Sequence, residues 1–106
     1  MVEVNGSDWK LFKKLLPIWQ NRHMQDLLSH YQDIINGKGQ PVDKFWALEK
    51  NINHDKRHKG VICQLSRSCM LNNIMDMLDE KAITFDDLKD FSENFQILVK
   101  NLYGIY

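Results

Sequence analysis

The residue types best suited to chemistry gather in one stretch of the chain, from Phe45 to Met70. This stretch holds two histidines one helical turn apart, His54 and His58, and the two cysteines, Cys63 and Cys69. Imidazole and thiolate groups are ligands that zinc prefers. On a continuous helix, however, Cys63 and Cys69 would project about 120° apart, so they could not meet on one ion. The spacing therefore predicts no metal and no other cofactor, and a small zinc-stabilised module is the third functional hypothesis.

A basic run overlaps the histidine pair, because Lys56, Arg57, His58 and Lys59 follow Asp55 directly. Cations in such a run can contact the phosphates of a nucleic acid. The same residues stand where a helix is expected to end, and cations there complement the partial negative charge of unpaired carbonyl groups. The pattern favours helix capping and leaves nucleic-acid binding through these four cations as the alternative function.

Motifs of enzymes are missing from the sequence. There is no Gly-x-Ser-x-Gly elbow for a nucleophile and no glycine-rich loop for a phosphate. A calcium loop around Ile83 would need glycine where the chain has Lys81. The 14 basic and 14 acidic side chains also cancel, so no long-range field draws the chain to nucleic acid or to an anionic membrane. We therefore expect a protein that is not an enzyme.

The spacing of apolar residues is helical almost throughout, which predicts an all-α fold. We expect residues 1–106 to form one compact domain, a bundle of about five helices. Ser7 or Asp8 is expected to cap a first short helix, which Pro17 stops or kinks. A second helix is predicted from about residue 18 to Asn36, where Gly37 would provide a left-handed end.

Proline at position 41 suits the first turn of a third helix. The pattern predicts that Phe45, Leu48 and Ile52 form the core stripe of this helix, which would end before Gly60. The histidine pair would then lie on the opposite, solvated side.

A fourth helix is predicted from about Val61 to Leu78, and it would be apolar on both faces. Such a helix would be the central element of the bundle, covered by neighbours all round. The alternative is a break near residues 66–68, with the two halves facing different partners. Thr84 and Asp87 then form a capping box for the last helix, which Ser92 could divide as a second cap. The apolar stripe of that last helix comprises Phe85, Leu88, Phe91, Phe95, Leu98, Val99 and Leu102.

Two apolar residues fall outside these stripes. Trp46 points about 100° away from Phe45, and Ile97 lies opposite the last stripe. At least one of them is expected to be exposed or to contact a second chain, although burial of Trp46 on a two-sided helix is favoured. Tryptophan is enriched at the energetic centres of protein interfaces. Trp46 and Ile97 are therefore the candidate partner-binding residues, and the partner is another protein or a second copy of this chain.

The segments DWKLFKKLLPIWQNRHM, KFWALEK, DKRHKGVI and ITFDDLKDFSENF together resemble a family of small proteins from Gram-positive bacteria and their mobile elements. The resemblance covers nearly the whole chain. Some members carry the label of multidrug transporter, which conflicts with this sequence because no stretch approaches eighteen uninterrupted apolar residues. The resemblance implies a soluble helical protein without an established activity, and no functional residue is carried over from it.

These observations favour a small, non-enzymatic protein-interaction module. The N-terminal residues lack the cationic start and apolar run of a signal peptide, so we expect a cytoplasmic location and no membrane partner. Small size and the resemblance suggest a more specific hypothesis, an inhibitor carried by a phage or mobile element that blocks a host defence nuclease.

Overall fold

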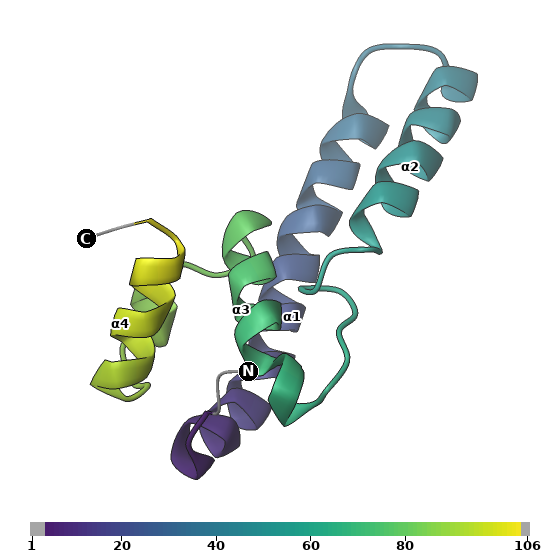
Figure 1. Cartoon of the computed structure of the whole chain (residues 1–106). Coiled ribbons are helices and arrows are strands. Elements are labelled where there is room, and N and C mark those ends of the chain that lie inside the picture. Colours follow the sequence, from purple (N-terminus) through teal and green to yellow (C-terminus); the bar gives the residue numbers. More distant parts are fainter. Residues whose placement is uncertain (1–3, 105–106) are drawn as a thin grey trace.

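The computed structural model describes residues 4–104, and this part of the chain contains four α-helices, two short 3-10 helices and no strand (Figure 1). The all-α class predicted from the apolar spacing is confirmed. The molecule is elongated rather than compact, with principal extents of 51 × 27 × 22 Å.

The first helix, α1, runs without interruption from Gly6 to Asn36. The predicted break at Pro17 is wrong. Pro17 lies on the exposed side of α1, where water can bond to the carbonyl group that loses its amide donor. The N-cap is Asn5 rather than Ser7 or Asp8, since its side chain accepts a hydrogen bond from the backbone N–H of Asp8 at 2.8 Å.

Helix α2 runs from Pro41 to Asp55, with proline in the first turn as predicted. It returns antiparallel along the second half of α1 (Figure 1). The connecting turn differs from the prediction because Gly37 has an ordinary φ of −72°, whereas Gly39 has the positive φ of 134°. Residues 24–36 of α1 together with α2 are called the helical arm below.

The predicted fourth helix from Val61 to Leu78 is wrong in its first half. Residues 62–66 form no helix, a 3-10 turn spans Arg67–Cys69, and helix α3 covers only Met70–Asp79. The non-helical segment is held to α3 by the buried amide of Asn73, which donates to the carbonyl of Gln64 at 2.9 Å. The alternative break near residues 66–68 is therefore the better description.

The end of the chain follows its capping signals. A 3-10 turn, η2, covers Phe85–Leu88, and helix α4 covers Glu93–Leu102. The capping box is confirmed, because the carboxylate of Asp87 accepts from the backbone N–H of Thr84 at 2.8 Å. Ser92 is the N-cap of α4, as predicted.

The hydrophobic core lies entirely outside the helical arm. The rest of residues 4–104, which contains this core, is called the body below. Within residues 4–104, no buried hydrophobic residue comes from positions 20–69. The core is formed by Val4, Phe12, Leu16, Trp19, Met70, Ile74, Met77, Leu78, Ala82, Ile83, Leu88, Phe91, Phe95 and Val99. The predicted core stripe of α2 is wrong, since Phe45 is 62% exposed and Ile52 is 46% exposed.

Candidate functional site

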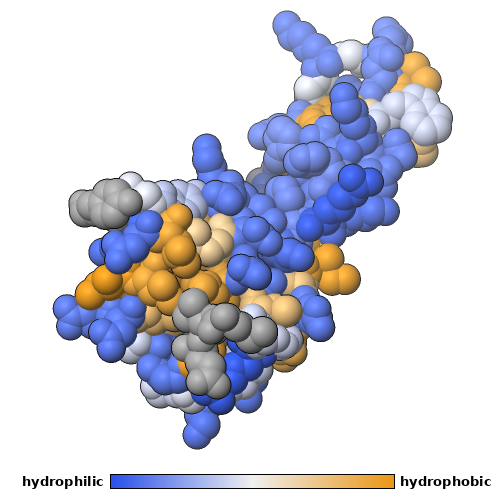
Figure 2. All heavy atoms as spheres, in the orientation of Figure 1, coloured by the Kyte–Doolittle hydropathy of each residue, from blue (hydrophilic) through white to orange (hydrophobic). Residues whose placement is uncertain are grey.

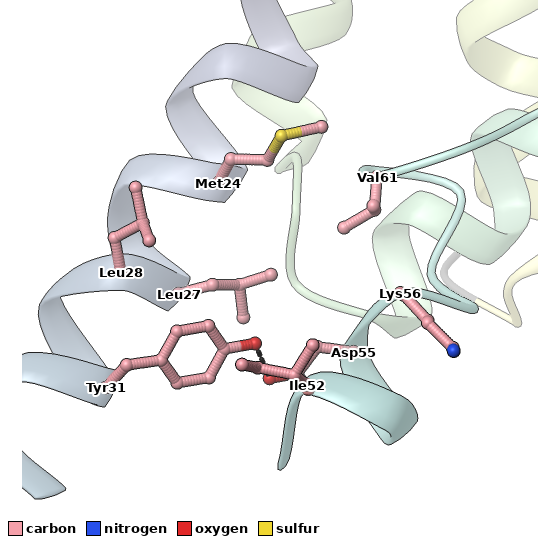
Figure 3. Close-up of a pocket in the computed structure, with 8 residues that line it drawn as sticks. All are labelled: Met24, Leu27, Leu28, Tyr31, Ile52, Asp55, Lys56 and Val61. Carbon is pink, nitrogen blue, oxygen red and sulfur yellow. Dashed lines mark hydrogen bonds between the residues drawn. The ribbon is translucent and has the colours of Figure 1, made fainter. Parts of the chain in front are cut away.

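An apolar groove of about 200 Å³ lies at the base of the helical arm, between α1 and the end of α2 (Figure 3). Its walls are mostly aliphatic, and its polar groups sit where α2 ends. The groove is lined by Met24, Leu27, Leu28, Tyr31, Ile52, Asp55, Lys56 and Val61. Side chains from α1 face those from α2 and the following loop across the groove.

The apolar side of the groove continues along the arm toward its tip. Leu28 and Ile35 are seven residues apart on α1, and Phe45 and Ile52 are seven residues apart on α2, so each pair shares one helix face. All four side chains are classed among the exposed large hydrophobic residues. Figure 2 shows apolar atoms near the far end of the arm, beside a largely hydrophilic surface. One side of the arm is therefore an apolar surface that nothing in residues 4–104 covers.

Trp46 belongs to this exposed region and is 59% exposed, so the expectation that it is buried is wrong. Only one side of α2 packs on α1, and Trp46 lies away from that side. The Trp46 ring meets that of Phe45 edge to face, with centroids 5.1 Å apart. The two rings form an exposed aromatic pair, an arrangement that typically stabilises packed or interface surfaces.

A cluster of polar side chains closes the base of the groove. It comprises His23 and Tyr31 from α1, His54 and Asp55 from the end of α2, and His58 from the next turn; these five residues are called the polar cluster. His23 Nε2 lies 3.1 Å from His58 Nδ1, and His54 Nδ1 lies 3.2 Å from Asp55 Oδ1. The Tyr31 hydroxyl donates to Asp55 Oδ2 at 2.5 Å. His23 and Asp55 are both buried.

The environment of the polar cluster shifts the pKa values of three members. Burial, and secondarily the neighbouring His58, lower the pKa of His23. Burial and the hydrogen bond to Asp55 raise the pKa of Tyr31 from 10.0 to about 12. Burial alone would raise the pKa of Asp55, but hydrogen bonds from Tyr31 and His54 outweigh it and the pKa is lowered. At neutral pH the cluster therefore holds a neutral phenol bonded to a carboxylate anion.

The loop after α2 is fixed tightly against the body. The carboxylate of Glu80 accepts from the backbone N–H groups of Lys59 and Gly60, at 3.0 and 3.2 Å. Gly60 touches His23 so closely that an added Cβ would lie 2.5 Å from His23 Cδ2. This contact places the loop, and with it His58, directly over the buried ring of His23.

The basic run stands at the end of α2, as predicted, since Lys56 is the C-cap of that helix, and it continues into this loop. Lys56 and Arg57 are exposed, whereas His58 and Lys59 are partly buried. His58 is engaged with His23, so two of the four proposed phosphate-binding side chains face solvent freely.

The cysteines lie apart from the histidines. Cys63 Sγ accepts from Gln20 Nε2 at 4.0 Å, and Cys69 Sγ lies 3.9 Å from Gln64 Oε1. Burial raises the pKa of the Cys63 thiol, which makes it a poor nucleophile at neutral pH. Neither cysteine joins a group of metal-binding side chains in the described part of the chain. The structure therefore does not bring together the four residues considered for zinc from the sequence.

Ile97, the second candidate partner-binding residue, lies on α4 and is 48% exposed. It shares this end of the molecule with Leu102, which is 55% exposed. Helix α4 lies apart from the helical arm, so this apolar surface is separate from the arm (Figure 1).

No family model matches the chain, and no curated protein or solved structure is significantly similar to it. Function must therefore be argued from the geometry of this chain. None of the helices in residues 4–104 is both long enough and apolar enough to span a membrane.

Three members of the polar cluster, His23, Tyr31 and Asp55, are not among the candidate site residues predicted from the sequence. A signal for His23 did exist, because it precedes Leu27 by four residues and Tyr31 by eight, and so lies on the face of α1 that packs inward. A polar residue on a packed face needs a partner, and His58 provides it.

Proposed function

We propose that this chain is a small, non-enzymatic protein-interaction module that binds an apolar helix of another protein along its helical arm. One observation carries the proposal: the arm contributes no buried hydrophobic residue within residues 4–104, yet both of its helices expose apolar side chains on the same side. A contiguous exposed apolar surface on a small protein is typical of an interaction site.

The geometry of the arm suits a helical ligand. An amphipathic helix that docks in a groove presents apolar anchors every three, four or seven residues. The Leu28/Ile35 and Phe45/Ile52 pairs repeat at seven residues on two antiparallel helices. A third helix laid between them would meet apolar groups from both sides, which is the packing of a helical bundle. The exposed aromatic pair of Phe45 and Trp46 adds the residue type most enriched at interface centres.

The charge of the chain supports an apolar rather than an ionic interface. Basic and acidic side chains are equal in number, and the apolar groove holds just one anion and one cation, Asp55 and Lys56. Binding to phosphates weakens by orders of magnitude as salt increases, whereas a largely apolar contact changes little. We therefore expect partner binding to persist at high salt.

The test compares two leucines of similar exposure, Leu28 on the arm and Leu102 on α4, which are 59% and 55% exposed. Each is replaced by Asp, and each tagged variant is used to capture proteins from the cells that carry the gene, at low and at high salt. We expect Leu28→Asp to lose the captured protein and Leu102→Asp to retain it, with unchanged melting temperatures for both.

Light scattering on the purified chain separates a foreign partner from a second copy. If the wild-type chain is a dimer that Leu28→Asp converts to a monomer, the occupant of the arm is a second copy. Loss of the captured protein in Leu102→Asp but not in Leu28→Asp would contradict the proposal and move the interface to the surface around Ile97. If the wild-type chain binds its partner at low salt and loses it at high salt, nucleic-acid contact through Lys56 and Arg57 is favoured instead.

A further inference from the structure

We propose that the polar cluster is a zinc-binding site, in which His54, Asp55 and His58 are the ligands and His23 supports His58. This inference goes beyond the interaction function of the arm, and its ligands are not the apolar residues that carry that function. It also replaces the ligand set considered from the sequence, because the two cysteines are absent from it and Asp55 takes their place.

The spacing of the donor atoms carries the inference. Zinc binds imidazole nitrogen and carboxylate oxygen at about 2.0–2.2 Å, so two ligands of a tetrahedral ion lie about 3.3 Å apart. The His54 Nδ1 to Asp55 Oδ1 distance is 3.2 Å, so this pair of donor atoms already has the separation that a single zinc ion requires.

The third ligand lies close to this pair. The ligand atoms of His54, Asp55 and His58 are all within 4.8 Å of one another. The His54 side chain is 76% exposed, so its ring can rotate to bring the three ligands onto one ion. His23 lies outside this group, but its Nε2 is 3.1 Å from His58 Nδ1, a contact that would orient the His58 ring and leave Nε2 of His58 for the ion.

The surroundings of the cluster are those of a supported metal site. Metal-binding carboxylates are typically hydrogen-bonded through the oxygen that does not face the metal. Asp55 fits this description, since Oδ2 accepts from Tyr31 while Oδ1 faces His54. The loop that carries His58 is fixed by Glu80 through the N–H groups of Lys59 and Gly60. These contacts orient Asp55 and His58, two of the three ligands, before any ion is bound.

The donor set selects the kind of metal. Two imidazoles and one carboxylate suit zinc and its neighbours in the transition series, whereas calcium and magnesium need several oxygen ligands. Three protein ligands leave the fourth position of a tetrahedral ion open to water. A bound ion would join the end of α2 to the following loop, at the point where the helical arm leaves the body.

The test uses protein without a histidine tag, stripped with chelator and titrated with zinc chloride by calorimetry and by melting curves. We expect one zinc per chain and a higher melting temperature when zinc is present. Cobalt in place of zinc should give the intense visible bands of a tetrahedral site, without the near-ultraviolet bands that thiolate ligands produce.

Variants separate ligands from bystanders. His54→Ala is the main probe, because the His54 side chain is 76% exposed and its truncation should leave the melting temperature of the metal-free protein unchanged. We expect His54→Ala and His58→Ala to weaken zinc binding by about 100-fold or more, and Tyr31→Phe to weaken it by about 10-fold to 100-fold. The matched control is His30→Ala, which removes the one histidine outside the cluster. Cys63→Ser with Cys69→Ser is the second control, and both controls should bind zinc as the wild type does.

Three results would overturn the assignment. The first is that zinc produces neither heat of binding nor a change in melting temperature in the wild-type chain. The second is that the cysteine variant loses zinc binding. The third is that His30→Ala and His54→Ala weaken zinc binding equally. Zinc binding by Leu28→Asp should equal that of the wild type, so failure of the arm as an interaction surface and failure of the metal site are separate outcomes.

Discussion

Replacement of Asp8 by alanine tests how the two ends of the body are joined. Asp8 lies in the first turn of α1 and is 3% exposed. Its carboxylate accepts from the backbone N–H of Ser92 at 2.8 Å and from the Ser92 hydroxyl at 2.6 Å. Ser92 is also the N-cap of α4, so these two bonds tie the start of α1 to the start of α4.

The expected loss of stability follows from these two bonds. Hydrogen bonds to a charged group contribute about 1.5–3 kcal/mol each, which gives about 3–6 kcal/mol for the pair. Ser92 is only partly buried, so water can replace part of the lost bonding. We therefore expect Asp8→Ala to lower the free energy of unfolding by about 3 kcal/mol, the lower end of that range. For a domain of this size, the melting temperature should fall by roughly 12 °C.

Urea unfolding of Asp8→Ala, Ser92→Ala and the double variant measures the contact directly. Ser92→Ala loses the hydroxyl bond to Asp8 and the capping bond from the Phe95 N–H, which is 3.3 Å long. Because both single variants lose the same hydroxyl bond, the double variant should be less destabilised than the sum, by about 1.5–3 kcal/mol. Ser7→Ala is the control, since Ser7 is exposed and should change stability by less than about 0.5 kcal/mol. A loss below about 1 kcal/mol for Asp8→Ala, or additive effects in the double variant, would refute this account.

Three further predictions test other parts of the molecule. Phe91→Ala should lower the free energy of unfolding by about 3–5 kcal/mol, measured by urea unfolding, because it empties a buried aromatic site. The pKa of Tyr31 is raised to about 12, so its hydrogen bond to Asp55 stabilises the fold fully below pH 10.0 and this stabilisation is lost as the pH rises through 12. Absorbance titration should show a late-titrating tyrosine that Tyr31→Phe removes. Burial raises the pKa of Asp87, but the hydrogen bond from Arg22 outweighs this and the pKa is lowered. Asp87→Asn should therefore lower the melting temperature at neutral pH, and its difference from the wild type should shrink as the pH falls below 3.8.

Local signals predicted the parts of the fold that local physics decides. The Thr84/Asp87 capping box and the Ser92 cap satisfy unpaired backbone groups within a few residues, and proline at 41 lacks the amide donor that would be unpaired in a first turn, so tertiary contacts need not be known. The helical period itself was also sufficient to establish the all-α class.

The signals failed where the outcome depends on which face of a helix meets a neighbour. Pro17 is compatible with α1 only because its side of the helix faces solvent, and nothing near it in the sequence states this. The apolar pattern after Val61 was interpreted as a helix buried on two sides, yet Ile62 and Leu65 are 67% and 57% exposed in a non-helical segment. Periodicity shows that a face is apolar, and it does not show whether that face is covered.

The same limit explains why the polar cluster was missed. His23 lies 35 positions before His58, and their contact depends on α2 folding back along α1. The predicted divergence of Cys63 and Cys69 assumes a continuous helix, which does not form between them. The contacts of Asp55 with Tyr31 and of His58 with His23 become visible only once α1 and the loop after α2 are placed side by side.

The apolar groove and the polar cluster share two residues, and this couples the two proposals. Tyr31 and Asp55 line the groove and are joined by the hydrogen bond that orients Asp55 toward His54 (Figure 3). A helix docked in the groove would exclude water from this bond, and an ion held by Asp55 would fix the same two side chains before docking. If zinc binding raises the affinity of the arm for its partner by some factor, the partner must raise the affinity for zinc by the same factor. Tyr31→Phe removes the shared bond, so it should abolish this mutual effect while leaving the apolar groove and the histidine ligands in place.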